Sequence, residues 1–270
     1  MLELILPTAV AYAESFADVP ESTLLPEELE ALGAARHEGR RREFTTVRHC
    51  ARRALADLGV PPVAVLPGER GAPVWPQGVV GSMTHCAGYR AAAVASRTRV
   101  RAVGIDAEPH EPLPGRVLGA IARAEERERL AVLTAECPQV RWDRLLFCVK
   151  ESVYKAWFPM TRRRLGFADA SVSFDRAAGT FRAELAELVE LVEHGDLGEA
   201  AGTDGAGGIG GAGGSSSSVI AGGGGTGEPP VPLRYEGRWA ATPELLLAAT
   251  VVPADPAVRN RLDYAIRQRS

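Results

Sequence analysis

Two acidic segments, residues 103–108 and 147–156, have the hydrophobic periodicities of a strand and of a helix. In the first, apolar and polar residues alternate, so a strand would bury its apolar set and project Asp106 and Glu108 from the other face. In the second, apolar residues follow helical spacing, which places Glu151 opposite the apolar stripe. The two segments therefore predict a strand and a helix whose polar faces carry three carboxylates.

These carboxylates form a candidate metal site. Three carboxylates without His or Cys partners suit Mg²⁺, which binds a few carboxylates, several waters and a substrate phosphate. Lys150 and Lys155 add positive charge beside this site. The alternative is that Asp106 and Glu108 lie in a solvated turn while Glu151 forms a surface ion pair with Lys155. Each segment taken alone leaves both interpretations open.

The remaining pattern predicts two similar halves. In the first half, the sequence predicts a strand at 2–6, a mostly helical stretch over 26–58 with a break around Gly39, and strands at 79–83, 90–95 and 102–108. In the second half, it predicts helices at 120–135 and 139–158 and strands at 170–174, 180–188, 234–240 and 245–252. Both halves thus show a helix followed by strands, which is consistent with a pseudo-duplicated α+β architecture.

A proline-rich stretch, residues 108–115, is the expected boundary between an N-terminal lobe, 1–111, and a C-terminal lobe, 112–270. Residues 195–232 are dominated by Gly, Ala and Ser and cannot bury enough apolar surface to offset their ordering entropy. We expect this segment to be a disordered insertion in the second lobe. The G-x-G-x-x-G match at 208–213 follows no predicted strand, so it does not indicate a dinucleotide site.

Composition excludes some functional classes. The net charge of −3 argues against nucleic acid as the principal partner. No apolar run is long enough to span a bilayer, so we expect no membrane association. The four cysteines have no paired metal spacing and are expected to be reduced, as in a cytoplasmic protein.

Combined, the two acidic segments resemble the signature of the 4'-phosphopantetheinyl transferases, in which (V/I)-G-(V/I)-D is followed by (F/W)-(S/C)-x-K-E-(S/A)-x-x-K. Residues 103–106 and 147–155 supply both halves in this order. Residues 81–86 and 44–52 resemble two further blocks of the family. The likeness runs from residue 38 to 168 and is greatest to the two-lobed, enterobactin-synthetase-associated type.

The resemblance implies a fold of two pseudo-symmetric α/β lobes with the active site in the cleft between them. It implies transfer of the 4'-phosphopantetheine arm of coenzyme A to a serine of an acyl-carrier or peptidyl-carrier protein, with release of adenosine 3',5'-bisphosphate. Mg²⁺ and coenzyme A, as substrate, are the implied small molecules. We expect a monomer whose acidic carrier partners dock on arginines of the first long helix or on Arg162, Arg163 and Arg164.

Carried over to this sequence, the resemblance implies that Asp106, Glu108 and Glu151 bind Mg²⁺. Glu151 is also the implied base that acts on the carrier serine, and Lys155 and His85 complete the implied catalytic set. A lone histidine is more often a hydrogen-bonded structural residue. The position of His85 in a block that resembles the family favours the functional role.

The implied coenzyme A contacts come from both halves of the chain. Those at or near the pyrophosphate are Thr84, His85, Asp106, Lys150 and Lys155. Arg40 and Arg48 are implied contacts of the 3'-phosphate end. Relatives often carry a lysine where this chain has 67–71, and Arg70 is expected to replace it. For the arginines of the first long helix, Arg41, Arg48 and Arg52, the alternative is a solvated basic surface.

Two other functions share part of this pattern. A Mg²⁺-dependent phosphatase or pyrophosphatase would use the same acidic residues and release free phosphate without a carrier. A coenzyme A-binding regulator would keep the pocket without transfer. The presence of Glu151 together with both lysines argues against the regulator, because a protein that only binds needs no base.

Overall fold

The computed structural model describes residues 1–33, 37–186 and 230–255. Its α-helices are α1 (Pro26–Leu32), α2 (Glu38–Asp57), α3 (Val117–Ile121), α4 (Ala124–Glu136) and α5 (Trp142–Thr161). Its strands are β1 (Ala11–Ser15), β2 (Leu66–Pro67), β3 (Pro73–Val74), β4 (Val79–Cys86), β5 (Tyr89–Ser96), β6 (Val100–Pro109), β7 (Ala170–Asp175), β8 (Thr180–Leu185), β9 (Arg234–Ala241) and β10 (Leu245–Pro253). Short 3₁₀ turns occur at Leu2–Leu4, Glu21–Thr23, Glu69–Gly71 and Phe167–Asp169.

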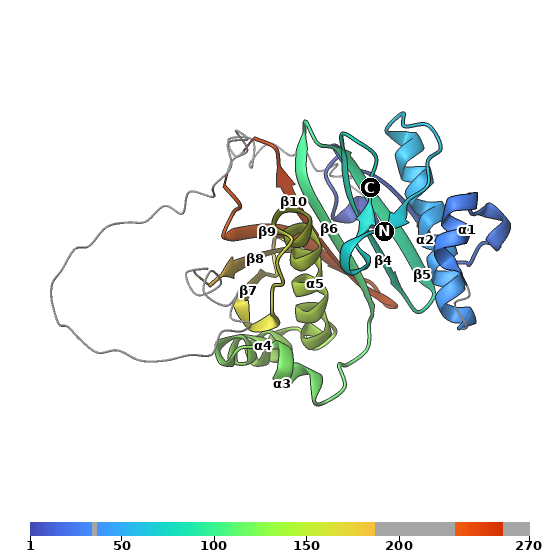
Figure 1. The fold of residues 1–270 in the computed structure, drawn as a ribbon. Helices are drawn as coiled ribbons and strands as arrows, with labels where there is room; N and C mark the ends of the chain where they lie inside the picture. Colours follow the sequence, from blue (N-terminus) through green and yellow to red (C-terminus); the bar gives the residue numbers. More distant parts are fainter. Residues whose placement is uncertain (34–36, 187–229, 256–270) are drawn as a thin grey trace, which may run out of the picture.

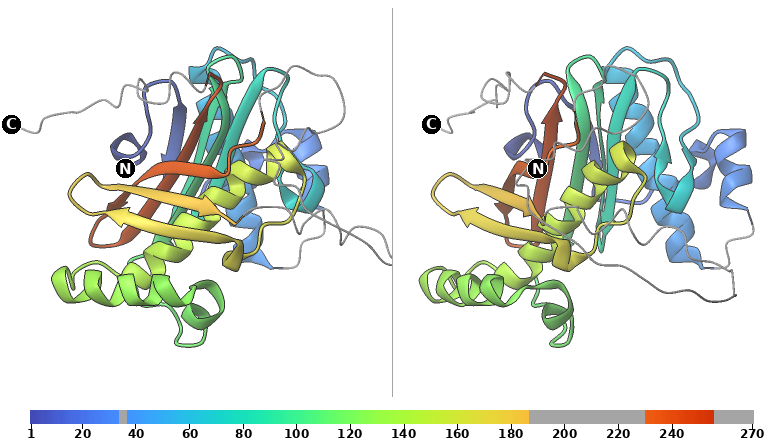
Figure 2. Two further views of the ribbon diagram at one scale, coloured as in Figure 1. Left: turned by 90° about the vertical axis from the view of Figure 1, so that its left-hand side faces the viewer. Right: turned by 60° about the vertical axis from the view of Figure 1, so that its left-hand side comes forward.

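Two antiparallel sheets each carry one long helix (Figure 1). The smaller sheet has the order β1-β5-β4, and the apolar face of α2 packs on it through Cys50, Ala54 and Leu55. The larger sheet has the order β6-β10-β9-β8-β7 and is covered by α5. In both views of Figure 2, α4 (green) lies below the β7–β8 hairpin (yellow). The two-lobed α/β fold predicted from the sequence is therefore confirmed.

Strand β6 joins the two sheets. On one edge it pairs with β10, with Asp106 opposite Ala248. On its other edge, hydroxyl groups of β4 take the place of a backbone ladder. The Ile105 amide donates to Ser82 Oγ at 3.1 Å and the Ala107 amide donates to Thr84 Oγ1 at 3.1 Å. Strand β6 precedes residue 111 but belongs to the larger sheet with C-terminal strands. The predicted division of the lobes at residue 111 stays a prediction.

The N-terminal residues do not form the predicted strand at 2–6. Leu2–Leu4 is a 3₁₀ turn, and Leu2, Ile5 and Leu6 are buried between the sheets while Leu4 is 49% exposed. The alternation of leucines suggested a strand, but burial at this turn follows a spacing of three to four residues. The prediction was wrong because a short apolar run is compatible with either conformation.

The other predicted elements agree with the structure apart from their bounds. The helical break lies before Glu38, so Gly39 is inside the first turn of α2. The helix predicted at 120–135 is preceded by the separate short helix α3. Residues 187–188 and nearly all of the Gly-rich segment at 195–232 lie outside the described residues. Within the described part of the chain, no helix is long and apolar enough to cross a membrane.

Candidate active site between the two halves

A cavity of about 510 Å³ lies between the smaller sheet and the C-terminal half of α5. Its walls come from β4, from the segment 68–75 and from α5. Five of the predicted catalytic, metal-binding and coenzyme A-binding residues line it: Arg48, Arg70, His85, Glu151 and Lys155. The structure therefore brings together residues from both of the sequence halves that had been linked only by resemblance.

Gly104 allows α5 to approach β6 closely enough to build this site. A Cβ atom at this position would lie 1.9 Å from the Ser152 carbonyl oxygen and 2.8 Å from the Ala156 amide nitrogen. No side chain can occupy such a space, so only glycine permits this crossing. The crossing lies two residues before Asp106 and beside Lys155, and it thereby brings the strand carboxylate to the helix.

Asp106 is 5% exposed and only one of its carboxylate oxygens is satisfied. Oδ1 accepts hydrogen bonds from Thr84 Oγ1 at 3.1 Å and from Lys155 Nζ at 2.7 Å. Oδ2 is buried and has no hydrogen-bond partner in the described part of the chain. A buried carboxylate oxygen without a partner is costly, so this atom marks a place where a bound cation would be stabilised.

Glu151 lines the cavity and makes no hydrogen bond or ion pair with the described residues. Burial raises the pKa of Glu151, and the Asp106 carboxylate raises it further while Lys155 opposes the change. The two carboxylates therefore interact electrostatically and repel each other when both are ionised. Such a pair is a favourable place for a divalent cation, which would remove the repulsion between them.

Glu108, the third predicted carboxylate, is partly engaged elsewhere. Its Oε2 accepts a hydrogen bond from the Arg144 guanidinium at 2.8 Å. Burial raises the pKa of Glu108, although Arg144 acts in the opposite direction. The described residues contain no group of three His, Cys, Asp or Glu side chains close enough to hold a metal ion. Asp106 and Glu151 thus fit Mg²⁺ with water and phosphate ligands, and Glu108 lies at the margin of that set.

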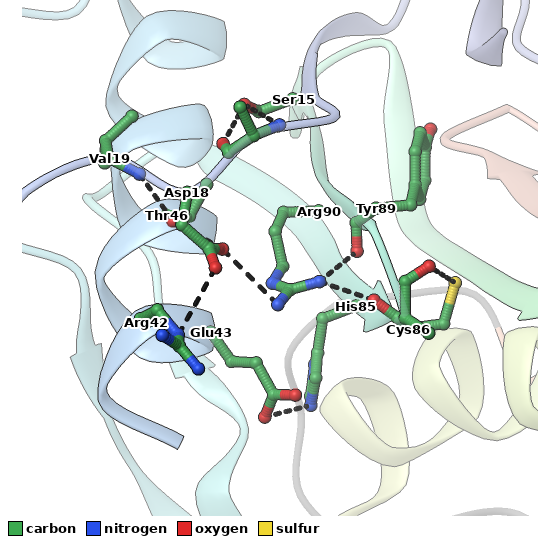
Figure 3. Close-up of polar contacts among 12 residues, drawn as sticks. Ser15, Asp18, Val19, Arg42, Glu43, Thr46, His85, Cys86, Tyr89 and Arg90 are labelled. Atoms are coloured by element: carbon green, nitrogen blue, oxygen red, sulfur yellow. Dashed lines mark hydrogen bonds and ion pairs between the residues drawn. The ribbon is translucent and has the colours of Figure 1, made fainter. Parts of the chain in front are cut away.

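His85 lies at the end of β4 and faces α2 (Figure 3). Its Nε2 is 3.3 Å from a carboxylate oxygen of Glu43. Burial lowers the pKa of His85, while Glu43 acts to raise it. The neighbouring hairpin is held by Arg90, which donates to the backbone carbonyl of Tyr89 at 3.0 Å and to that of Cys86. The imidazole therefore lies on a firmly anchored strand end.

Thr84 serves Asp106 directly. Its side chain is 1% exposed, and its hydroxyl accepts from the Ala107 amide while it donates to Asp106. It is not among the residues that line the cavity. In this structure the Thr84 hydroxyl orients the Asp106 carboxylate, and its contact with coenzyme A stays a prediction.

The structure does not bring Lys150 to the site. This side chain is 3% exposed, and its ammonium donates to Glu126 at 2.7 Å and to three backbone carbonyls, those of Ile121, Phe167 and Ala170. These bonds use all three N–H donors of the ammonium, and the pyrophosphate contact of Lys150 stays a prediction that they argue against. Five residues of an α-helix turn a side chain by about 140°, so Lys150 and Lys155 cannot share one face.

The three predicted arginines differ in their positions. Arg48 is buried, stacks over the Phe44 ring and donates from Nε to the Val65 carbonyl at 3.1 Å. Burial lowers the pKa of Arg48 to about 10. Arg70 lies at the cavity in a left-handed conformation, with φ of 53°. Arg40 is exposed on the first turn of α2 and does not line the cavity.

Sequence reasoning missed several residues of the cavity wall. These are Trp75, Arg97, Arg101 and Tyr154. Trp75 is fixed by a hydrogen bond from its indole nitrogen to the Gly81 carbonyl at 2.9 Å. Arg97 and Arg101 flank the turn between β5 and β6, where an arginine has no distinguishing pattern. Only the tertiary arrangement of these segments identifies them.

Both halves of the chain match sequence families of known proteins. Residues 28–95 match the 4'-phosphopantetheinyl transferase N-terminal domain. Residues 102–196 match the 4'-phosphopantetheinyl transferase superfamily. The interval between the two matches falls close to the turn between β5 and β6.

Individual relatives extend this similarity. The chain is 53% identical over 176 residues to 4'-phosphopantetheinyl transferase PptT of Mycobacterium tuberculosis, covering 63% of this chain and 76% of that protein. It is 52% identical over 192 residues to 4'-phosphopantetheinyl transferase Npt of Nocardia iowensis, covering 68% and 85%. Enterobactin synthase component D of Salmonella typhi is 36% identical over 126 residues, covering 45% and 51%.

Proposed function

The chain belongs to the 4'-phosphopantetheinyl transferase superfamily, and we propose that the cavity between β4 and α5 is its active site. The enzyme transfers the phosphopantetheine arm of coenzyme A to carrier proteins. The observation that supports the location most strongly is the buried Oδ2 of Asp106, which interacts electrostatically with the Glu151 carboxylate. Neither this oxygen nor the Glu151 carboxylate has a hydrogen-bond partner among the described residues. The phosphatase and regulator alternatives have no support among the relatives.

In the proposed reaction, the carrier serine oxygen forms a bond to the phosphorus attached to the pantetheine arm. The bond from that phosphorus to the bridging pyrophosphate oxygen breaks, and adenosine 3',5'-bisphosphate leaves. Glu151 accepts the serine proton, directly or through a water molecule. Because its pKa is raised, the Glu151 carboxylate is a stronger base than an ordinary one.

Charge on the leaving bisphosphate is stabilised by groups that surround the cavity. Lys155 has three N–H donors and uses two on Ile105 and Asp106, so one remains for a phosphate oxygen. His85 lies beside it, and Arg48 and Arg70 suit the 3'-phosphate end. When bound, Mg²⁺ at Asp106 and Glu151 would supply further positive charge against the pyrophosphate oxygens.

The proposed docking site for the carrier lies at the C-terminal end of α5. Arg162, Arg163 and Arg164 are exposed there, and Arg162 also lines the cavity. Acidic acyl-carrier and peptidyl-carrier proteins suit such a surface. Two arginines of α2 are less suitable, because Arg41 pairs with Glu21 and Arg52 pairs with the buried Glu28.

We further propose a cytoplasmic monomer that acts without nucleic acid or membrane. The four cysteines are free, and Cys50, Cys137 and Cys148 are buried. Thiols in that state are usual in a reducing compartment.

The test of the site combines mass spectrometry with one variant. The protein is incubated with coenzyme A, Mg²⁺ and a panel of apo-carriers, and the carriers are weighed. We expect a gain of one phosphopantetheine mass, a large loss of rate in Asp106→Ala, and partial recovery of that variant at high Mg²⁺. Glu111→Ala, an exposed change near the same strand, should match the unaltered protein. Equal Mg²⁺ dependence of Asp106→Ala and the unaltered protein would contradict the metal role.

A further inference from the structure

A second buried carboxylate lies away from the proposed chemistry. Glu28, on the short helix α1, is 0% exposed. Its Oε2 accepts from the Leu25 amide at 3.1 Å and from the Arg52 guanidinium of α2, and its Oε1 accepts from the Val65 amide at 3.0 Å. Arg52 also donates to the Thr23 carbonyl. A fully buried charge that is this well satisfied fixes the geometry of everything bonded to it.

The peptide groups of Val65 are held from both sides. Glu28 of α1 accepts from the amide, and Arg48 of α2 donates to the carbonyl at 3.1 Å. The Val65 side chain is itself fully buried against α2 and β5. Two helices therefore fix one residue of a connection that has no regular secondary structure.

Val65 is the point at which the chain enters the cavity wall. It is followed directly by β2, by the turn that carries Arg70, and by β3, and all of 68–75 lines the cavity. The far end of this segment is fixed by Trp75, which bonds to the Gly81 carbonyl. Between these two anchors, the turn is closed by the Gly68 amide, which donates to the Ala72 carbonyl at 2.7 Å. The position of Arg70 depends on both ends.

We propose that Glu28 and Arg52 are positioning residues for coenzyme A, which act by fixing the segment 66–75 through Val65. The inference rests on the proposed function, in which Arg48 and Arg70 bind the 3'-phosphate end. Neither Glu28 nor Arg52 lines the cavity, so their effect is indirect. Arg48 belongs to both groups, because its Nε holds Val65 while the residue itself lines the cavity.

The mechanism predicts an effect on substrate binding and not on chemistry. Loosening Val65 would let Arg70 sample positions away from the phosphate, and coenzyme A would have to order the segment on binding. Glu151, Lys155 and Asp106 lie on α5 and β6 and would keep their geometry. The Michaelis constant for coenzyme A should therefore rise while kcat and the Michaelis constant for the carrier stay the same.

The test uses Glu28→Gln, which keeps the size of the side chain and one carbonyl acceptor but removes the charge that binds Arg52. Glu27→Gln, an exposed neighbour on α1, is the matched control. Steady-state transfer to an apo-carrier gives kcat and both Michaelis constants, and amide hydrogen exchange reports on residues 66–75. If Glu28→Gln does not fold, Arg52→Lys replaces it, because a lysine keeps a cation at Glu28 but cannot also reach the Thr23 carbonyl.

We expect the Michaelis constant for coenzyme A to rise about tenfold in Glu28→Gln, with faster exchange confined to 66–75 and with Glu27→Gln unchanged. A lower melting temperature with an unchanged coenzyme A constant would overturn the inference and leave Glu28 a purely structural residue. Uniformly faster exchange across α1, α2 and 66–75 would overturn it too. Transfer by the unaltered protein is the internal reference, so its absence would instead count against the proposed function.

Discussion

Two lysines on the same helix differ in how many protein groups their ammonium groups bind. Lys150 and Lys155 are five residues apart on α5, and the sequence motif contains both. The ammonium of Lys150 has four protein acceptors, one of them the buried Glu126, within the C-terminal half. The ammonium of Lys155 has two, Ile105 and Asp106, and lies at the cavity.

The difference shows which lysine can still bind a ligand. An ammonium has three N–H donors, so the four acceptors around Lys150 use its full capacity, whereas Lys155 has one donor left. Burial lowers the pKa of Lys150 despite Glu126. Burial also acts to lower the pKa of Lys155, but Asp106 and Glu151 act in the opposite direction and the net pKa is raised. Lys155 is therefore a permanent cation at the cavity, and Lys150 is an anchor between α5 and its neighbours.

The largest expected effect is on the rate of transfer, and it comes from a change at Glu151, which lines the cavity together with Lys155. Glu151→Gln removes the proposed base and weakens the metal site, so kcat should fall about 10³-fold, and excess Mg²⁺ should not restore it. Single-turnover transfer to an apo-carrier measures this loss. Recovery to the original rate at high Mg²⁺ would show that Glu151 acts only as a metal ligand.

The next effect concerns stability on the Lys150 side. Lys150→Met leaves the Glu126 carboxylate buried without its cation, which typically costs about 3–5 kcal/mol. Adding Glu126→Leu should recover the part of this free energy of unfolding that comes from the unpaired charge. It should not recover the part that comes from backbone groups left without partners, namely three carbonyls bound by Lys150 and two amides bound by Glu126. Urea denaturation of the two variants measures the difference. Equal stability of Lys150→Met and the unaltered protein would remove the reason for calling Lys150 an anchor.

A smaller effect is expected from the carboxylates themselves. Because the folded pKa of Glu151 is raised above its ordinary value of 4.5, folding favours the protonated form, and the ionised form costs stability at neutral pH. Glu151→Gln should therefore raise the melting temperature of the metal-free protein by about 2–4 °C at pH 7, as a gain on the order of 1 kcal/mol would. The gain should shrink as the pH falls through the raised pKa and vanish below 4.5. A lower melting temperature of the variant at pH 7 would contradict the electrostatic account.

Periodicity in the sequence predicted the face on which Asp106, Glu151 and Lys155 lie, and the resemblance to the family supplied their proposed roles. The structure places Glu151 and Lys155 at the cavity and joins Asp106 to Lys155. The contacts of Lys150 could not be predicted in this way, because they are made with Glu126 and three carbonyls that belong to other segments. Hydrophobic periodicity predicts the face of a helix or strand on which a side chain lies. It does not predict which groups of other segments that side chain contacts.

The same limit applies to the fold. The long helices and most strands of both sheets follow from hydrophobic patterns, although β1 was not predicted. The placement of β6 between the sheets depends instead on Ser82 and Thr84 hydroxyls that bond to its backbone. Arg40 and Arg48 are likewise indistinguishable as basic residues of one helix. Burial against Val65 and Phe44 places Arg48 at the cavity, and Arg40 remains in solvent.

The most direct measurement compares coenzyme A binding by two variants in isothermal titration calorimetry with Mg²⁺ present. One is Lys155→Met, and the other is the double variant Lys150→Met with Glu126→Leu, which removes the anchor without leaving a buried charge. We expect the double variant to bind coenzyme A with the dissociation constant of the unaltered protein and Lys155→Met to bind at least about tenfold more weakly. Weakened binding by the double variant with normal binding by Lys155→Met would contradict the assignment of the two lysines.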